Sequence, residues 1–389
     1  MVNTFIHSKI PHIIFGSSSR KELSSIVSRW GNDVLLVTGK TSLLSNIKGL
    51  EVINALKNSK VKVRIITITS EPSPENIDAA VAEIKDNLPD VVVAIGGGSV
   101  IDVGKAISAM LTVDEKIHNY LEGIGELQHP GTKIPFIAVP TTAGTGSEAT
   151  KNAVISHIGE DGYKKSLRHD NFIPEVALID PELMLSCPPD ITAAAGMDAF
   201  TQLVESYLSK KANPVTDALA VDGINRLIHS LEKAVNHPQS IHAREDLAYA
   251  ALISGITLAN SGLGVVHGFA QPLGSLFTIP HGVVCATLMG AANTITIEKI
   301  LASGEKSVAL GKYSTLGRMI ARREDSDVSL AETFAEYVDE LTEKLNIPLL
   351  SKYGVGEQHI EKIVSFTGLK EHPVKLTKEE LVIILRERI

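Results

Sequence analysis

The first half of the chain alternates short apolar runs with amphipathic stretches, and this alternation constrains the fold more than any other feature. The apolar runs cover residues 10–15, 33–38, 61–69, 90–95 and 134–139. Helical patterns lie between them, for example over residues 73–88 and 99–111. The β-branched residues of these runs favour strands, and a run as apolar as DVVVAI is typical of a strand covered on both faces. Strands that alternate with helices predict an α/β fold with a mainly parallel sheet.

The second half of the chain shows helical periodicity and no convincing pair of strands. The predicted helices cover residues 192–209, 214–237, 244–261, 329–345 and 377–388. The alternating pattern ends near Asp180-Pro181, and the helical pattern begins after Pro188. We therefore predict an α/β domain over residues 1–185 and an all-α domain over residues 186–389.

Composition excludes several classes of protein. The chain has 389 residues, a formal net charge of −8 and a hydrophobic share of 44%, values that exclude a disordered or collagen-like chain. The acidic balance argues against nucleic-acid binding, and no uninterrupted apolar run approaches the roughly 20 residues of a membrane span. Two cysteines make no disulfide framework. A cytoplasmic protein without a membrane anchor is the expectation.

A glycine-rich turn follows the fourth apolar run directly. Gly96-Gly97-Gly98-Ser99 ends that run and opens a predicted helix. Glycines allow a ligand to approach the backbone closely, and the free N–H groups and dipole at a helix N-terminus favour an anion such as a pyrophosphate. The turn is neither GxGxxG nor a Walker motif. On these four residues alone, a phosphate site and a simple tight turn remain equally open.

A second turn of similar composition follows the fifth run. It has the sequence PTTAGTGSE over residues 140–148, with two glycines and several hydroxyl groups. Ligands of parallel sheets bind at the carboxyl ends of the strands, so the two turns are expected to face one crevice. Together they favour nucleotide binding over a flexible loop.

Four polar residues of the second half suggest a metal site. Asp198 and Gln202 are four residues apart in a predicted helix and so share one face. His267 and His281 are each followed by glycine. A carboxylate, an amide oxygen and two imidazoles suit a divalent ion. Taken singly, Asp198 is equally explained by an ion pair and Gln202 by a backbone cap.

Several motifs together resemble a known family. GGGSVIDVGK at 96–105 fits the pattern GGGSxxDxxK, and it is followed by PTTAGTGSE, by AGMDA at 195–199 and by the stretch from His267 to Gly282. In these motifs and their order, along nearly its whole length, the chain resembles the iron-containing (group III) alcohol dehydrogenases. The resemblance implies an N-terminal dinucleotide-binding domain, a helical metal and substrate domain, a catalytic cleft between them and, commonly, a homodimer.

Site residues follow from the resemblance position by position. It implies Fe²⁺ or Zn²⁺ held by Asp198, Gln202, His267 and His281, and it assigns the chemistry to this metal centre rather than to a separate catalytic side chain. It implies a nicotinamide dinucleotide held by Gly97, Gly98 and Ser99, with Asp102 close by. The remaining cofactor contacts that it implies are Thr141, Thr142, Thr145, Asn152, Lys164 and Leu183.

The sequence departs from the family pattern at three informative positions. Gln202 stands where the second ligand is usually His, which weakens the site or changes the ion, because an amide oxygen is a poorer donor than imidazole. Gln271 replaces a further His, so a proton relay there is in doubt. Gly39 stands where many NAD-using members have Asp, and loss of this carboxylate admits a 2′-phosphate. We therefore expect NADP(H), with NAD as the weaker alternative.

The resulting hypothesis is a metal-dependent, NADP(H)-linked alcohol dehydrogenase or aldehyde reductase that acts on a small alcohol or aldehyde. Three alternatives remain open. One is a metal-independent reductase of an oxo-acid, similar to the maleylacetate reductases, and another is a lyase of the dehydroquinate-synthase type. The third is a non-catalytic nucleotide-binding protein. Cys285 is interpreted as a small buried hydrophobic residue, and Cys187 has no assigned role.

Overall fold

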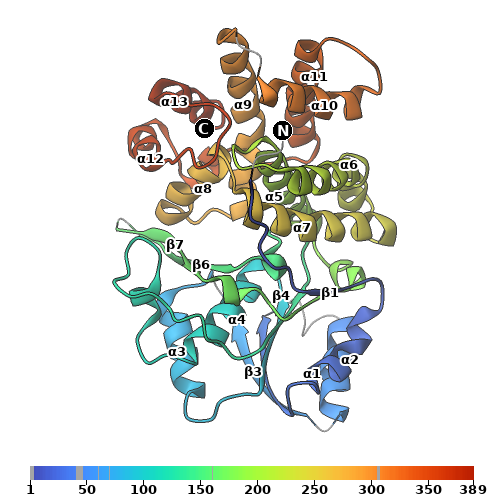
Figure 1. The fold of residues 1–389 in the computed structure, drawn as a ribbon, viewed down its shortest axis with the longest axis vertical. Coiled ribbons are helices and arrows are strands. Elements are labelled where there is room, and N and C mark those ends of the chain that lie inside the picture. Colours follow the sequence, from blue (N-terminus) through green and yellow to red (C-terminus); the bar gives the residue numbers. More distant parts are fainter. Residues whose placement is uncertain (1–3, 41–46, 60, 70, 160, 305–306) are drawn as a thin grey trace.

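A computed structural model describes residues 4–40, 47–59, 61–69, 71–159, 161–304 and 307–389 of the chain. Its N-terminal half contains a six-stranded sheet in the order β1-β8-β5-β4-β2-β3 (Figure 1). The strands are β1 (His12–Phe15), β2 (Asp33–Gly39), β3 (Lys62–Ile68), β4 (Val91–Gly96), β5 (Phe136–Pro140) and β8 (Val176–Ile179). Every pairing in this sheet is parallel. The predicted α/β fold with a mainly parallel sheet is confirmed.

Four helices cover the two faces of the sheet (Figure 1). They are α1 (Leu23–Val27), α2 (Ile47–Asn58), α3 (Pro74–Ile84) and α4 (Gly98–Met110). In β2, Leu35 packs in the cluster that contains α3 and α4, whereas Leu36 packs in the cluster that contains α1 and α2. Successive side chains of a strand point to opposite faces, so a strand buried on both faces must be apolar throughout. This burial explains the unbroken apolar runs of the sequence.

A two-stranded antiparallel hairpin, which the sequence did not predict, lies beside the sheet. It consists of β6 (Asn152–His157) and β7 (Tyr163–Arg168). The strand β7 reads YKKSLR, and most of its side chains are partly exposed, so it lacks the apolar signal by which the other strands were recognised. The hairpin lies between the sheet and the helical half of the molecule (Figure 1).

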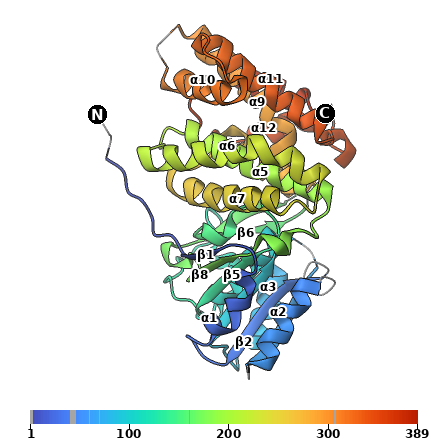
Figure 2. The ribbon, with the colours of Figure 1, turned by 90° about the vertical axis from the view of Figure 1, so that its right-hand side faces the viewer.

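The C-terminal half is helical and stacks against the α/β half (Figures 1 and 2). Its helices are α5 (Pro189–Leu208), α6 (Pro214–Asn236), α7 (Ile241–Ser261), α8 (Val265–Leu276), α9 (His281–Ala302), α10 (Val308–Ala321), α11 (Asp327–Lys344), α12 (Ile360–Phe366) and α13 (Lys378–Arg386). No strand occurs after residue 188 in the part of the chain that the structure describes. The predicted all-α half is therefore confirmed. Helix α7 faces the α/β half.

Short 3₁₀ helices connect these elements. Their bounds are Ser19–Glu22, Ile117–Tyr120, Ser147–Ala149, Asp170–Phe172, Pro181–Met184, Leu350–Tyr353 and Glu357–His359. The segment Ser147–Ala149 belongs to the second glycine-rich turn. The nine residues of this turn, 140–148, are mostly buried. The turn is therefore an ordered structural element and not a flexible surface loop.

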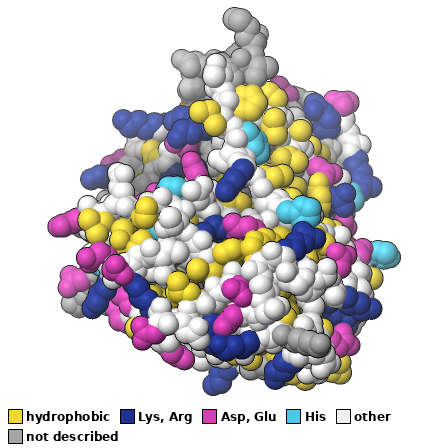
Figure 3. Space-filling model, turned by 60° about the horizontal axis from the view of Figure 1, so that its bottom comes forward, with side chains coloured by type: hydrophobic (Ala, Val, Ile, Leu, Met, Phe, Trp, Pro, Cys, Tyr) yellow, Lys and Arg dark blue, Asp and Glu magenta, His cyan; other side chains and the backbone are white. Residues whose placement is uncertain are grey.

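Helix α9 is long and apolar enough to pass a membrane-span test by length and composition. In the structure, 83% of its apolar window is buried inside the protein, mainly against α5, α8 and α11. Helix α9 is therefore a core helix of the protein. Figure 3 shows acidic and basic side chains interspersed over the face at the sheet end of the molecule. This face therefore shows no extended positively charged patch of the kind that binds a polyanion.

Candidate active-site cleft

The two glycine-rich turns lie side by side at the carboxyl ends of neighbouring strands, as expected from the sequence. Gly96 at the end of β4 pairs with Pro140 at the end of β5, and the Thr141 N–H donates to the Gly96 carbonyl at 2.9 Å. A Cβ atom at Gly98 would stand 2.6 Å from Cγ2 of Thr145. This distance is shorter than real Cβ contacts, so the close approach of the two turns requires glycine here.

A buried lysine fastens the second turn to helix α4. Lys105 is fully buried and donates to the carbonyls of Ser147 and Asn152, each at 2.8 Å. Its ammonium also lies 3.9 Å from Asp102, which accepts from the hydroxyl of Ser147 and from the Val154 N–H at 2.9 Å. The Asp and Lys of the GGGSxxDxxK motif therefore hold the turn in place behind the cleft.

The second turn also contacts the helical half directly through the backbones of two glycines. Gly146 has a φ of +61°, a left-handed conformation that favours glycine. A Cβ atom at Gly255 of α7 would stand 2.1 Å from the Gly146 carbonyl oxygen. The two halves of the molecule therefore meet backbone to backbone at this turn, which fixes the position of the helical residues over the cleft.

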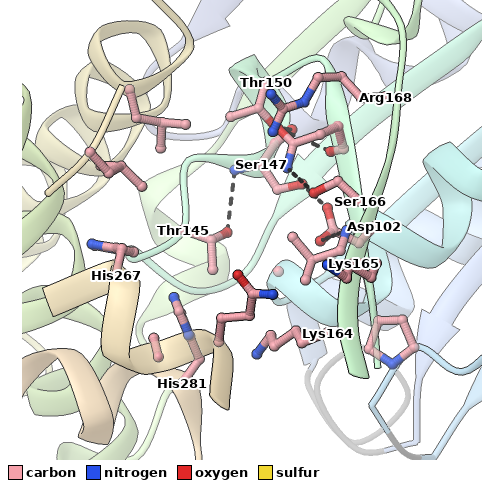
Figure 4. A pocket seen from close by; sticks show the side chains of 18 of the residues that line it. Asp102, Thr145, Ser147, Thr150, Lys164, Lys165, Ser166, Arg168, His267 and His281 are labelled. Carbon is pink, nitrogen blue, oxygen red and sulfur yellow. Dashed lines mark hydrogen bonds between the residues drawn. The ribbon is translucent and has the colours of Figure 1, made fainter. Parts of the chain in front are cut away.

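Three of the predicted metal ligands converge from three helices. Asp198 comes from the middle of α5, His267 from the first turn of α8 and His281 from the first residue of α9. Oδ1 of Asp198 lies 3.4 Å from Nε2 of His267 and 3.6 Å from Nε2 of His281. Figure 4 shows the two histidines on one side of the cleft, opposite Lys164 and Asp102. Residues that are far apart in the sequence thus form one cluster.

The chemistry of this cluster fits a divalent cation. Oδ1 of Asp198 is buried and has no hydrogen-bond partner among the described residues. Burial opposes ionisation of Asp198, but positive charge on the imidazoles of His281 and His267 outweighs it and lowers the pKa of Asp198 to about 2, and a divalent cation at this point would supply the same charge. A buried, ionised oxygen without a hydrogen-bond donor is costly unless a cation accompanies it. The site therefore has the charge and the open acceptor that a metal ion requires.

Glu205, which the sequence analysis missed, orients one of the histidines. Its Oε2 lies 2.6 Å from Nδ1 of His267, and its Oε1 accepts from the Val266 N–H at 2.7 Å. A carboxylate beside Nδ1 holds the proton on that nitrogen and leaves Nε2 free to bind a metal. Glu205 lies two turns after Asp198 in α5, and this periodic spacing was the only available sign of its role.

Gln202 lies one turn after Asp198 and lines the cleft, so it faces the same region. Its Oε1 accepts a hydrogen bond from the Ser254 hydroxyl of α7 at 2.7 Å. Cys285 of α9 lies closer to the histidines than the sequence suggested. Asp198, His267, His281 and Cys285 each offer one possible ligand atom, and these four atoms all lie within 4.8 Å of one another.

The cleft between the two halves has a volume of ≈ 380 Å³. The predicted site residues that line it are Gly98, Ser99, Asp102, Thr145, Asn152, Lys164, Gln202, His267 and His281. Asp198 lies behind the two histidines and is only 2% exposed. The cleft thus joins the first glycine turn to the histidine cluster.

Five predicted cofactor residues lie outside the cleft lining. They are Gly39, Gly97, Thr141, Thr142 and Leu183. Gly39 ends β2, and a Cβ at Gly97 would touch the Thr142 hydroxyl at 3.4 Å. The Leu183 side chain is 1% exposed and packs in the core. Their contacts with a cofactor remain predictions.

Besides Lys164, which the family resemblance implied, the cleft contains three cations that the motifs did not reveal. Lys164, Lys165 and Arg168 come from β7, and Lys370 comes from the segment between α12 and α13. Lys370 has a φ of +50°, which is uncommon for a residue with a side chain. The motifs missed Lys165 and Arg168 because they lie on the unpredicted hairpin strand β7. They missed Lys370 because it is about 200 residues away in the sequence and reaches the cleft only through the tertiary fold.

Comparison with known proteins agrees with this arrangement of glycine-rich turns, a helical half and a cluster of possible metal ligands. The model of the iron-containing alcohol dehydrogenases matches residues 11–181. The model of the Fe-containing alcohol dehydrogenase family, C-terminal, matches residues 192–389. The two models together cover most of the chain.

Individual relatives match over nearly their full length. The 1,3-propanediol dehydrogenase of Klebsiella pneumoniae is 33% identical over 377 residues, which are 93% of this chain and 94% of that protein. The NADPH-dependent butanol dehydrogenase of Clostridium saccharobutylicum is 29% identical over 379 residues, 95% of this chain and 94% of that one. A crystal structure of 1,3-propanediol oxidoreductase superposes with a TM-score of 0.88, 30% identity and 100% coverage of both chains.

The named relatives are alcohol dehydrogenases, so this fold and cleft are those of an NAD(P)-dependent oxidoreductase. The chain belongs to the iron-containing alcohol dehydrogenase family. This membership implies a nicotinamide cofactor, a divalent metal and a small alcohol or aldehyde as substrate. Membership of an oxidoreductase family argues against the lyase and the non-catalytic alternatives.

Proposed function

We propose that this protein transfers hydride between NADP(H) and a small alcohol or aldehyde with the help of a divalent ion. The observation that carries the proposal is the convergence of Asp198, His267 and His281 at one end of a cleft whose other end is the glycine turn at Gly98. Fe²⁺ and Zn²⁺ are the candidate ions. A homodimer in the cytoplasm is the proposed working state.

The first turn of α4 holds the cofactor diphosphate in this proposal. The backbone N–H groups at Gly98 and Ser99 begin the helix and have no partner within it, so they and the helix dipole attract an anion. Gly98 has no side chain to block this approach. Thr145, Asn152 and Lys164 line the cleft between the turn and the histidines and supply polar contacts along the cofactor.

The helical residues hold the metal and position the substrate oxygen. An ion bound by Asp198, His267 and His281 supplies Lewis acidity, worth several kcal/mol at a transition state that develops negative charge on oxygen. Glu205 keeps His267 in the tautomer that presents Nε2. Gln271 lines the cleft where the family usually has His, and because an amide does not titrate, we assign no proton relay to this position.

The preference for NADP(H) depends on the end of β2. Gly39 ends this strand and exposed Lys40 follows it, so no carboxylate of these two residues is present to repel a 2′-phosphate. The relative from Clostridium saccharobutylicum is named for its NADPH dependence, which supports the proposal. Gly39→Asp should shift kcat/KM toward NADH, and Gly39→Asn, which has the same shape without the charge, should shift it less. Equal kcat/KM values for NADH and NADPH in the wild-type protein would contradict this part of the proposal.

The metal role is tested by histidine variants. His267→Ala and His281→Ala should each abolish aldehyde reduction while NADPH still binds, because the metal cluster and the glycine turn are separate parts of the cleft. His242→Ala is the matched control, since His242 is a largely exposed residue of α7. Full activity in both site variants would refute the proposed role of the cluster.

A second candidate function keeps the fold but not the metal. The cations Lys164, Lys165 and Lys370 line the cleft and form no ion pair with any of the described residues, whereas Arg168 pairs with Glu122 at 3.3 Å. Such a lining favours a substrate with a carboxylate, as expected for an oxo-acid reductase. Reduction of an oxo-acid that resists chelators, together with a large loss of activity in Lys370→Ala, would favour this candidate over the first.

A further inference from the structure

Cys285 lies one helical turn after His281 on α9, so both side chains lie on the same face of that helix. Its sulfur is 3.7 Å from Nε2 of His281 and 3.6 Å from Nε2 of His267. These are the same two nitrogens that lie beside Oδ1 of Asp198. The thiol therefore faces the metal cluster, rather than only filling the apolar core as its sequence context suggested.

The spacing of the four atoms matches a single tetrahedral site. Zinc binds sulfur at about 2.3 Å and nitrogen at about 2.0–2.1 Å, so tetrahedral angles place these two ligand atoms about 3.5 Å apart and two nitrogen or oxygen ligands about 3.3 Å apart. The observed sulfur–nitrogen distances are 3.6 and 3.7 Å. The oxygen–nitrogen distances are 3.4 and 3.6 Å. Four of the six distances are therefore within a few tenths of an ångström of tetrahedral values, and the remaining two, sulfur to oxygen and nitrogen to nitrogen, are no longer than 4.8 Å.

The residue that stands at the usual second ligand position has another partner. Oε1 of Gln202 lies 2.7 Å from the hydroxyl of the fully buried Ser254, whose single proton can go to this oxygen or to the Ala251 carbonyl at 2.8 Å. To bind an ion through this oxygen, Gln202 must share it with the hydroxyl or give up the hydrogen bond. Oδ1 of Asp198, in contrast, is buried, adjoins both histidines and has no hydrogen-bond partner in the part of the chain that the structure describes. The two observations favour the side of the cluster that Cys285 occupies.

We propose that Cys285 is the fourth protein ligand of the metal, in place of Gln202, and that the resulting oxygen, two-nitrogen and sulfur donor set selects Zn²⁺ over Fe²⁺. Thiolate is a soft ligand that favours zinc, whereas the harder oxygen donors lack this preference. On binding, a metal–sulfur bond forms and the S–H bond breaks, with the proton leaving to water. This inference rests on the proposed metal site and concerns which side chains form it.

The decisive experiment uses Co²⁺ as a spectroscopic probe of the full-length protein. We expect the protein to take up about one Co²⁺ per chain and to show an intense thiolate-to-cobalt charge-transfer band in the near ultraviolet. Cys285→Ser should abolish this band and weaken Zn²⁺ binding by more than about tenfold, because even residues that only orient ligands contribute about 10–100-fold. Under anaerobic competition between the two ions, this variant should shift the bound ratio toward Fe²⁺.

Two variants serve as matched controls. Cys187→Ser removes the only other cysteine of the chain and should leave the cobalt band unchanged. Gln202→Ala should also leave the band and the Zn²⁺ affinity unchanged. If Cys285→Ser does not fold, X-ray absorption at the zinc edge of Cys187→Ser still tests the proposal, because a sulfur neighbour at about 2.3 Å must then come from Cys285.

The outcomes separate this inference from the proposed function. Uptake of Co²⁺ without a charge-transfer band, together with weaker binding in Gln202→Ala, would overturn the role of Cys285 and leave the metal-dependent function intact. A failure of the protein to bind Co²⁺ or Zn²⁺ at all would overturn both.

Discussion

Replacement of Lys105 by Met tests the architecture of the cleft most sharply. Met is similar in length to Lys but has no charge and no hydrogen-bond donor. Lys105 is fully buried and donates to the carbonyls of Ser147 and Asn152. The substitution should therefore remove the ammonium donor from both carbonyls, which keep the longer contacts with Thr150, and loosen the second glycine-rich turn from α4.

The magnitude follows from the contacts. A hydrogen bond from a charged donor contributes about 1.5–3 kcal/mol, and removal of a buried ammonium recovers part of its desolvation penalty. We expect Lys105→Met to lower the free energy of unfolding by about 3 kcal/mol at pH 7. Because the turn lies beside the phosphate site, the Kd for NADPH should also rise.

The pH dependence adds a signature with a definite sign. Burial lowers the pKa of Lys105 to about 8 from 10.5. A folded-state pKa below the unfolded value means that the cost of the buried charge is fully present below pH 8 and is relieved as the pH rises toward 10.5. The wild-type protein gains this relief and the variant does not. The stability difference should therefore grow by up to about 1.4 kcal/mol per pH unit between pH 8 and pH 10.

Urea unfolding followed by circular dichroism measures the stability, and NADPH fluorescence measures the affinity. Lys57→Met is the matched control, because Lys57 is exposed on α2 and its replacement should cost less than about 0.5 kcal/mol. If Lys105→Met is as stable as Lys57→Met and binds NADPH equally well, the assigned role of Lys105 is wrong.

Three further predictions concern single side chains. Gly98→Ala places a Cβ 2.6 Å from Thr145, which should cost about 1–3 kcal/mol of stability and weaken NADPH binding in a fluorescence titration; unchanged affinity would count against the site. The ammonium of Lys48 lowers the pKa of Glu182 to about 2, so Glu182→Gln should destabilise the protein above pH 4.5 and the difference should disappear as the pH falls toward 2, as chemical denaturation would show. Burial raises the pKa of Glu148 to about 7, so its carboxylate costs stability as the pH rises from 4.5 to 7. Glu148→Gln should accordingly raise the Tm more at pH 8 than at pH 5, and an equal change at both values would contradict this reasoning.

Much of the fold could be predicted from the sequence because local patterns record burial. The run that became β2 is apolar throughout, since Leu35 and Leu36 pack against different helix layers. The glycine turns were also recognisable, because close backbone approach at Gly98 leaves no room for a side chain. Such features depend on neighbours within a few residues, and a sequence displays them directly.

Other features could not be predicted because they depend on distant partners. The hairpin strand β7 is polar and carries no burial signal, yet it brings Lys164 to the cleft. Helix α9 is buried on most of its surface, so it lacks the one-sided pattern of an amphipathic helix. The closeness of Cys285 to His267 depends on how α8 crosses α9, which no spacing within one helix reveals. The spacing from Asp198 and the family resemblance both supported Gln202 as a ligand, but neither reveals that Gln202 lies against Ser254 of another helix.

In the proposed reaction, an ion held by the histidine cluster takes part in hydride transfer to a small aldehyde. The most direct measurement is the rate of NADPH oxidation with butyraldehyde as a function of bound Zn²⁺ or Fe²⁺, after chelation and with the fold checked by circular dichroism. We predict no turnover in the metal-free protein and a linear recovery that saturates at about one ion per chain. An unchanged rate in folded protein that contains no metal would contradict the claim.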